Sequence, residues 1–147
     1  MNGTCMKKTT VKRQIVWGDL DSLGIVFYPH YYKWIDASGH MFFQSLNLAL
    51  GNLWKERGII FGLLETGCEY HLPGRYNEWI EIVTYIDDIS DKAVLLRHDI
   101  SRLPDRALMV KGFEKRICLD VSDPLKFQAI DIPHDIRTIL SKAQSYK

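Results

Sequence analysis

The fold is decided by the segment Pro29-His-Tyr-Tyr-Lys-Trp-Ile-Asp-Ala-Ser-Gly-His-Met-Phe-Phe-Gln-Ser45. Its apolar and small side chains recur at steps of three and four, the spacing that places residues on one face of an α-helix. Proline suits the first helical position, where the backbone N–H that it lacks would have no intrahelical partner. The segment predicts a deeply buried helix of about 17 residues. Its buried face is expected to carry Tyr31, Trp34, Ile35, Ser38, Met41, Phe42 and Ser45.

The sequence after this helix is mostly extended. A shorter helix over 49–57 is expected to end at Gly58, because glycine readily adopts the left-handed conformation that closes a helix. Alternating apolar residues separated by turn residues then predict strands, since this is the pattern of a half-buried sheet. A short C-terminal helix is expected from Pro133 through Leu140. The expected strands cover 59–71, 79–89, 93–102, 107–120 and 127–130.

A short extended run precedes the long helix. Val11, Arg13, Ile15 and Trp17 share one side of it, and Ile15 and Trp17 are expected to be its buried anchors. The turns at 90–92 and 104–106 are short, and short turns join antiparallel neighbours. The long helix is the only element able to cover the apolar face of such a sheet. The pattern therefore predicts an α+β fold in which an antiparallel sheet wraps around a central helix.

Size and composition fit one soluble domain. The chain has 147 residues, and a single domain over 1–147 is expected, with residues 1–10 as a flexible tail. Nineteen Lys and Arg residues balance 18 Asp and Glu residues, which gives no electrostatic reason to expect nucleic acid as a partner. No apolar stretch is long enough for a membrane span, and the polar N-terminus lacks the core of a secretory signal. The three cysteines have no metal-site spacing, which favours reduced thiols in a cytoplasmic protein.

Two segments carry a more specific pattern. The first is Val16-Trp-Gly-Asp-Leu-Asp-Ser-Leu-Gly-Ile-Val-Phe-Tyr-Pro-His-Tyr-Tyr-Lys-Trp-Ile-Asp-Ala37, and the second is Tyr70-His-Leu-Pro-Gly-Arg-Tyr-Asn-Glu-Trp-Ile-Glu-Ile82. Both closely resemble the signature of the 4-hydroxybenzoyl-coenzyme A thioesterase family, and looser similarity extends to about Asp120. The resemblance implies a hot-dog fold, a homodimer or homotetramer, and an active site at the interface between two protomers.

The same resemblance implies roles for two residues. Asp21 corresponds to the family's catalytic carboxylate, and the backbone N–H of Tyr28, at the start of the helix, polarises the thioester carbonyl. These groups suit the chemistry, because thioester hydrolysis needs an oxygen that attacks or activates water and donors for the oxyanion. The start of a helix supplies such donors. Gly24, between the two, allows the backbone to approach a ligand closely.

Each candidate also has a structural interpretation. An Asp in a loop before a helix usually forms a turn or caps backbone N–H groups. Asp19 is the other candidate for either task. His30 is expected to pack or to face solvent, because related thioesterases that use a histidine here place it one residue earlier. Asp36 lies either at the helix surface or in contact with a ligand or a loop.

An acyl-CoA ester needs an apolar slot for the acyl group and cations for its phosphates. The phosphates are expected to meet Lys92, in a turn where the resembling enzymes carry a basic cluster, and Arg97. Arg75, Arg102 and Lys115 are alternatives. No metal or cofactor is expected, since a thiolate is a good leaving group and coenzyme A is part of the substrate. The residues expected around the acyl group are Gly24, Phe27, Pro29, Tyr31, Asp36 and Phe61.

We therefore expect a cytoplasmic acyl-CoA thioesterase for an aryl or short-chain acyl group, with Asp21 as nucleophile or general base. A thioesterase for acyl-carrier-protein substrates is one alternative. A non-catalytic acyl-thioester-binding protein is another, which the absence of a usable carboxylate would indicate. A dehydratase on the same fold would need a histidine a few residues after the Asp, and the segment 23–26 has none.

Overall fold

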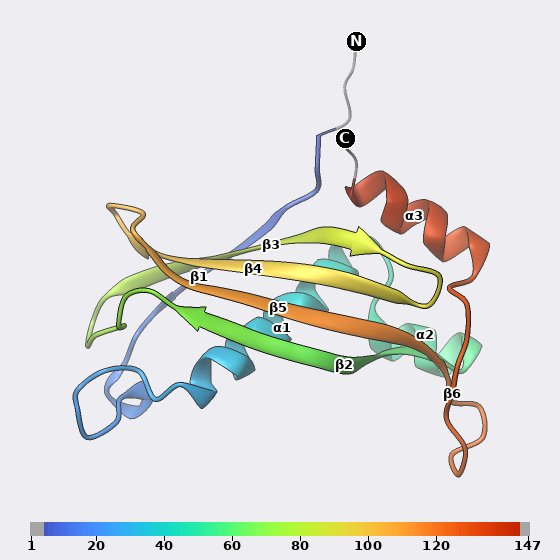
Figure 1. Cartoon of the computed structure of the whole chain (residues 1–147), viewed down its shortest axis with the longest axis horizontal. Helices are drawn as coiled ribbons and strands as arrows, with labels where there is room; N and C mark the ends of the chain where they lie inside the picture. The colour runs from blue at the N-terminus through green and yellow to red at the C-terminus, as the bar shows by residue number, and fades with distance from the viewer. Residues whose placement is uncertain (1–4, 145–147) are drawn as a thin grey trace.

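The structure, a computed structural model, describes residues 5–144 and contains one antiparallel sheet that curls around a long helix (Figure 1). The strand order is β1-β3-β4-β5-β2, and β6 pairs with β5. All the pairs are antiparallel, which confirms the expected α+β architecture. The strands are β1 (Thr9–Gln14), β2 (Ile59–Tyr70), β3 (Trp79–Ile89), β4 (Ala93–Leu103), β5 (Leu108–Asp120) and β6 (Gln128–Ala129).

Helix α1 (Pro29–Ser45) lies across one face of this sheet, as Figure 1 shows, and has the predicted bounds. The expected buried face is correct in its first three turns. It is wrong at Met41, which is 49% exposed, and at the exposed Ser45, because these residues lie at the rim and at the end of the helix. Gly39 and Phe43 are buried in their place. A Cβ on Gly39 would collide with the Glu114 carboxylate, so glycine lets α1 approach the sheet closely.

Two further helices close the end of the sheet away from the start of α1. Helix α2 (Leu50–Arg57) ends at Gly58, whose φ of 64° is the predicted left-handed cap. Helix α3 (His134–Gln144) extends one turn beyond the expected Leu140, because Ala143 also packs in the core. Apolar residues of α1, α2 and α3 form one continuous cluster against the sheet.

The N-terminal segment differs from expectation in two ways. Thr9 and Thr10 pair with β3, and Lys7 N–H donates to Ala143 O at 2.8 Å, so residues 7–10 are not the expected flexible tail. Residues 1–4 lie outside the described part of the chain. Ile15 is fully buried, as predicted, but Trp17 is 75% exposed. The reason is that the chain leaves β1 after Gln14 and turns into the one-turn helix η1 (Trp17–Asp19).

A chain of polar side chains connects α1 to the centre of the sheet. Thr84 Oγ1 lies 2.8 Å from His98 Nδ1, and His98 Nε2 lies 2.9 Å from Glu114 Oε1. Arg116 Nη2 donates to Glu114 Oε2 and to Asp36 Oδ1, each at 2.8 Å. Only Asp36, on α1, has an exposed side chain. Since an unpaired buried charge is very costly, these contacts fix α1 against the strands.

We expect Arg116→Met to lower the free energy of unfolding by about 3–5 kcal/mol, because it leaves the buried Glu114 carboxylate without its cation. Asp36→Asn is the matched control. It removes only the exposed partner and should cost less than about 1 kcal/mol. Urea unfolding followed by circular dichroism measures both. If Arg116→Met unfolds at the same urea concentration as the wild type, the network does not stabilise the fold.

Candidate active site

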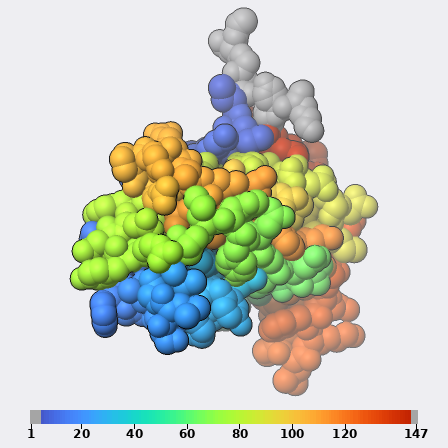
Figure 2. Space-filling view, turned by 60° about the vertical axis from the view of Figure 1, so that its left-hand side comes forward, coloured from blue at the N-terminus to red at the C-terminus, as the bar shows by residue number. Residues whose placement is uncertain are grey.

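The loop that leads into α1 is held by backbone hydrogen bonds. Asp21 N–H donates to Ile25 O at 2.8 Å, and Gly24 N–H donates back to Asp21 O at 3.0 Å. Gly24 has a φ of 76°, a left-handed conformation that glycine adopts without strain. Val26 N–H then donates to Gly74 O at 2.9 Å, which fastens the loop to the segment that follows β2. Figure 2 shows the two segments in contact at the surface, the loop in blue below the yellow-green segment.

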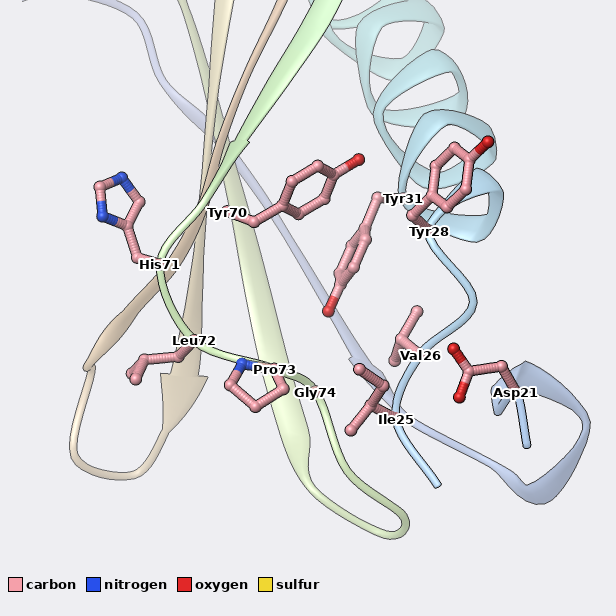
Figure 3. Close-up of a pocket in the computed structure, with 10 residues that line it drawn as sticks. All are labelled: Asp21, Ile25, Val26, Tyr28, Tyr31, Tyr70, His71, Leu72, Pro73 and Gly74. Carbon is pink, nitrogen blue, oxygen red and sulfur yellow. The ribbon is translucent and has the colours of Figure 1, made fainter. Parts of the chain in front are cut away.

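A pocket of about 430 Å³ lies between this loop, the start of α1 and the segment after β2 (Figure 3). Most of its wall is apolar or aromatic. It brings together three of the residues predicted from sequence, namely Asp21, Tyr28 and Tyr31. The complete lining is Asp21, Ile25, Val26, Tyr28, Tyr31, Tyr70, His71, Leu72, Pro73 and Gly74.

The Asp21 carboxylate is held by one oxygen only. Its Oδ1 accepts a hydrogen bond from Leu23 N–H at 2.8 Å, an interaction typical of Asp in a turn. No group within residues 5–144 donates to Oδ2. Figure 3 shows the carboxylate directed toward Val26 and the pocket. The turn therefore orients Asp21 and leaves one oxygen available to a substrate or to water.

The start of α1 presents one unpaired backbone donor. Pro29 has no N–H, while His30 N–H donates to Phe27 O at 2.9 Å and Tyr31 N–H to Tyr28 O at 3.0 Å. Among the described residues nothing accepts a hydrogen bond from Tyr28 N–H. This N–H lies at the positive end of the helix dipole, where a developing negative charge is stabilised.

Tyr31 and Gly74 define the interior of the pocket. Burial raises the pKa of Tyr31 to about 12, although a hydrogen bond from the Gly74 backbone partly offsets the rise. A Cβ on Gly74 would lie 2.8 Å from the Tyr31 hydroxyl, 2.8 Å from Val26 Cγ2 and 2.9 Å from Ile15 Cδ1. Only glycine fits at this position without displacing the pocket wall.

Asp19 and His30, the other polar candidates, have structural contacts. Asp19 is buried, and its Oδ2 accepts a hydrogen bond from Val16 N–H at 2.9 Å and lies 3.6 Å from Arg13 Nη2. Asp19 therefore forms the turn, the alternative that the sequence left open. The His30 ring stacks on Trp34 with centroids 6.2 Å apart and does not line the pocket.

Several predicted substrate contacts lie outside the pocket of the single chain. Phe61, expected in the acyl slot, is 1% exposed and stacks on Phe43 in the core, because its side of β2 faces α1. Asp36 forms the ion pair with Arg116 described above. The positions Gly24, Phe27 and Pro29 adjoin the pocket in sequence without lining it.

The expected coenzyme A cations lie elsewhere on the surface. Lys92 pairs with Asp131 at 2.8 Å, and Arg97 pairs with Asp87 at 3.0 Å. Neither lines the pocket of Asp21, but Arg97 borders two shallow hollows on the sheet together with Phe113.

Sequence reasoning missed one wall of the pocket, residues 70–74. Their signal is the second resembling segment, whose Tyr-x-x-Pro pattern begins at Tyr70. Its side chains suggest no chemistry, so the sequence alone does not assign it to the site. Two functional features are also absent from the described range 5–144: a cluster of three potential metal ligands, and a helix long and apolar enough to cross a membrane.

This combination, a curled sheet around one helix with an acid facing the helix start, defines the hot-dog class of thioesterases. A family model described as the thioesterase superfamily matches residues 23–108. The chain is also 28% identical to the 4-hydroxybenzoyl-CoA thioesterase of Pseudomonas sp. (strain CBS-3), over 88% of this chain and 94% of the relative. The chain therefore belongs to the thioesterase superfamily, and the expectation of a thioester-hydrolysing enzyme is confirmed.

Solved structures support the same assignment. A 4-hydroxybenzoyl-CoA thioesterase with an Asp-to-Asn mutation, complexed with 4-hydroxybenzoyl-CoA, superimposes with a TM-score of 0.82 at 26% identity and covers 92% of this chain and 99% of its own. A gentisyl-coenzyme A thioesterase gives a TM-score of 0.77 at 28% identity, over 90% of this chain and 100% of its own. Both likenesses span nearly the whole chain, so the hot-dog fold is confirmed.

We expect Gly74→Ala to lower the free energy of unfolding by about 1–3 kcal/mol, the usual cost of forcing an extra carbon into a packed site. Gly51→Ala is the control. A Cβ there meets no atom within 4 Å, and alanine favours the helix by up to about 1 kcal/mol. Thermal unfolding of both variants measures the difference. A Gly74→Ala protein as stable as Gly51→Ala would contradict the tight packing around Gly74.

Proposed function

We propose that this enzyme hydrolyses acyl-CoA thioesters with an aryl or short-chain acyl group, using Asp21 as nucleophile or general base. The observation that carries the proposal is that one pocket holds both the free oxygen of Asp21 and the start of α1, where Tyr28 N–H is unpaired among the described residues. A carboxylate and an oxyanion donor are the two groups that thioester hydrolysis requires.

The reaction follows one of two courses in this geometry. As a nucleophile, Asp21 adds to the thioester carbonyl, the C–S bond breaks, and water hydrolyses the resulting anhydride. As a general base, Asp21 takes a proton from water, whose hydroxide adds to the same carbon before the thiolate leaves. In both courses the carbonyl oxygen becomes negative beside Tyr28 N–H.

The pocket supports the proposed acyl group. Its volume of about 430 Å³ and its wall of Tyr28, Tyr31 and Tyr70 with aliphatic neighbours suit a single ring or a short chain. Two relatives are named for 4-hydroxybenzoyl and gentisyl thioesters, whose acyl groups contain one aromatic ring.

We also propose that the active form is a homodimer or homotetramer whose protomers meet at this site. Leu23, Phe27 and Tyr28 are large, exposed and adjacent to the pocket, and β2 is a long edge strand of the sheet. A second protomer would bring Gly24, Phe27, Pro29 and Asp36 into contact with substrate. Sedimentation equilibrium tests the assembly, and a purely monomeric active enzyme would reject it. The three free cysteines at 5, 68 and 118 support a reducing cytoplasmic location.

We expect Asp21→Asn to lower kcat about 10²–10⁴-fold, the usual contribution of a positioned acid–base group. Release of free thiol from benzoyl-CoA and short acyl-CoA esters measures the rate. Asp123→Asn is the matched control, because Asp123 also accepts a hydrogen bond from the N–H two residues on, at 3.0 Å, but lies outside the pocket.

Other outcomes separate the alternatives. Full activity in Asp21→Asn would reject Asp21 as the catalytic group. Hydrolysis of acyl-carrier-protein thioesters in preference to the CoA esters would favour the carrier-protein alternative. Tight binding of acyl-CoA without any turnover would indicate a binding protein.

We propose that Lys92 and Arg97 contact the phosphates of coenzyme A. Both side chains are about half exposed, and Arg97 lies near two further cations, Lys111 and Lys115, that border the same hollows. Clustered cations suit phosphate groups.

Arg97→Gln should raise KM for acyl-CoA about fivefold, which corresponds to about 1 kcal/mol for an exposed ion pair. It should leave KM for the matching acyl-pantetheine unchanged, since that substrate has no nucleotide. Lys92→Gln tests the second contact in the same way, and Lys126→Gln, on an exposed loop, is the control. Equal effects on both substrates would place the phosphates elsewhere.

A further inference from the structure

The Tyr31 ring is held rigidly at the inner wall of the pocket. Its side chain belongs to the first turn of α1, and the residue is 3% exposed. The ring packs edge-on against Trp34 with centroids 5.3 Å apart and lies tilted on Tyr70 at 5.9 Å. With both neighbours in place, the hydroxyl occupies a fixed position.

That hydroxyl is directed into the pocket beside Gly74, as Figure 3 shows. Its oxygen accepts the hydrogen bond from the Gly74 backbone, so its lone pair is used and its hydrogen is free to point elsewhere. Within residues 5–144 no protein group accepts that hydrogen. Burial keeps the phenol protonated, because its pKa is raised to about 12. Tyr31 is therefore a fixed, neutral donor with no acceptor among the described residues.

The surroundings make this donor selective. Ile25, Val26, Leu72 and Pro73 contribute aliphatic surface to the same pocket. A ligand that fills such a pocket displaces water from the hydroxyl, and a buried donor left without an acceptor costs about 1–3 kcal/mol. A ligand that supplies an acceptor avoids this cost, so sites built in this way reject analogues that lack the polar group.

We propose that Tyr31 determines acyl specificity by donating a hydrogen bond to a polar substituent of the acyl group. The inference rests on the proposed function and adds to it the kind of acyl thioester that is preferred, one with a hydroxyl or similar acceptor away from the thioester carbon. Tyr28 N–H serves the carbonyl oxygen, and Tyr31 serves the other end of the acyl group.

Binding and turnover test this separately. Calorimetry compares the non-hydrolysable benzyl thioether of coenzyme A with its three monohydroxybenzyl isomers. We expect the wild type to bind at least one hydroxylated isomer about tenfold more tightly than the parent, and Tyr31→Phe to reduce that ratio to about one. Tyr70→Phe is the control. The Tyr70 hydroxyl is hydrogen bonded with Tyr32 and Cys68, so the ratio should survive its loss.

The turnover arm uses benzoyl-CoA and the hydroxybenzoyl-CoA esters. Loss of selectivity in kcat/KM with Tyr31→Phe, while benzoyl-CoA hydrolysis continues, supports the inference. A wild type without preference, or an equal loss on every ester, overturns it. If the wild type hydrolyses none of the esters, the proposed function fails, and the binding ratio still decides the role of Tyr31.

Discussion

The structure depends on the packing of one helix across one curled sheet. Without α1 the apolar face of the sheet would be open to water, and α1 is the only long helix in the described chain. Two features set how closely they meet. Gly39 removes the side chain that would collide with Glu114, and Arg116 joins that carboxylate to Asp36 on the helix. Because both act in the middle of α1, they also fix where the helix begins.

The beginning of α1 is the part that matters for chemistry. A helix start normally offers several unpaired donors. Here proline removes one, and turn-like hydrogen bonds use those of His30 and Tyr31, so Tyr28 N–H remains. The loop that carries Asp21 is fixed in a similar way, since its turn occupies one carboxylate oxygen and leaves the second. Main-chain geometry, more than side-chain variety, thus defines the candidate site.

Much of this was predictable from sequence, because periodicity and turn residues are local signals. The bounds of α1, the cap at Gly58 and the antiparallel strands follow from them, and the two resembling segments placed Asp21 and Tyr28 at one site. Local signals failed where distant parts of the chain meet. Phe61 lies on an apolar strand, and its alternation alone cannot separate a core position from a slot. The wall at 72–74 acts through position and backbone shape, which no side-chain motif reveals.

The single bond from Val26 N–H to Gly74 O has a consequence for how the pocket comes into being. Its two walls are separated by more than forty positions along the chain, so neither exists as a binding surface when the ribosome has released only the first. The cavity assembles late, after β2 has paired with β5 and returned its end to the helix start. Activity is accordingly a property of the completed sheet, and partial chains are inert.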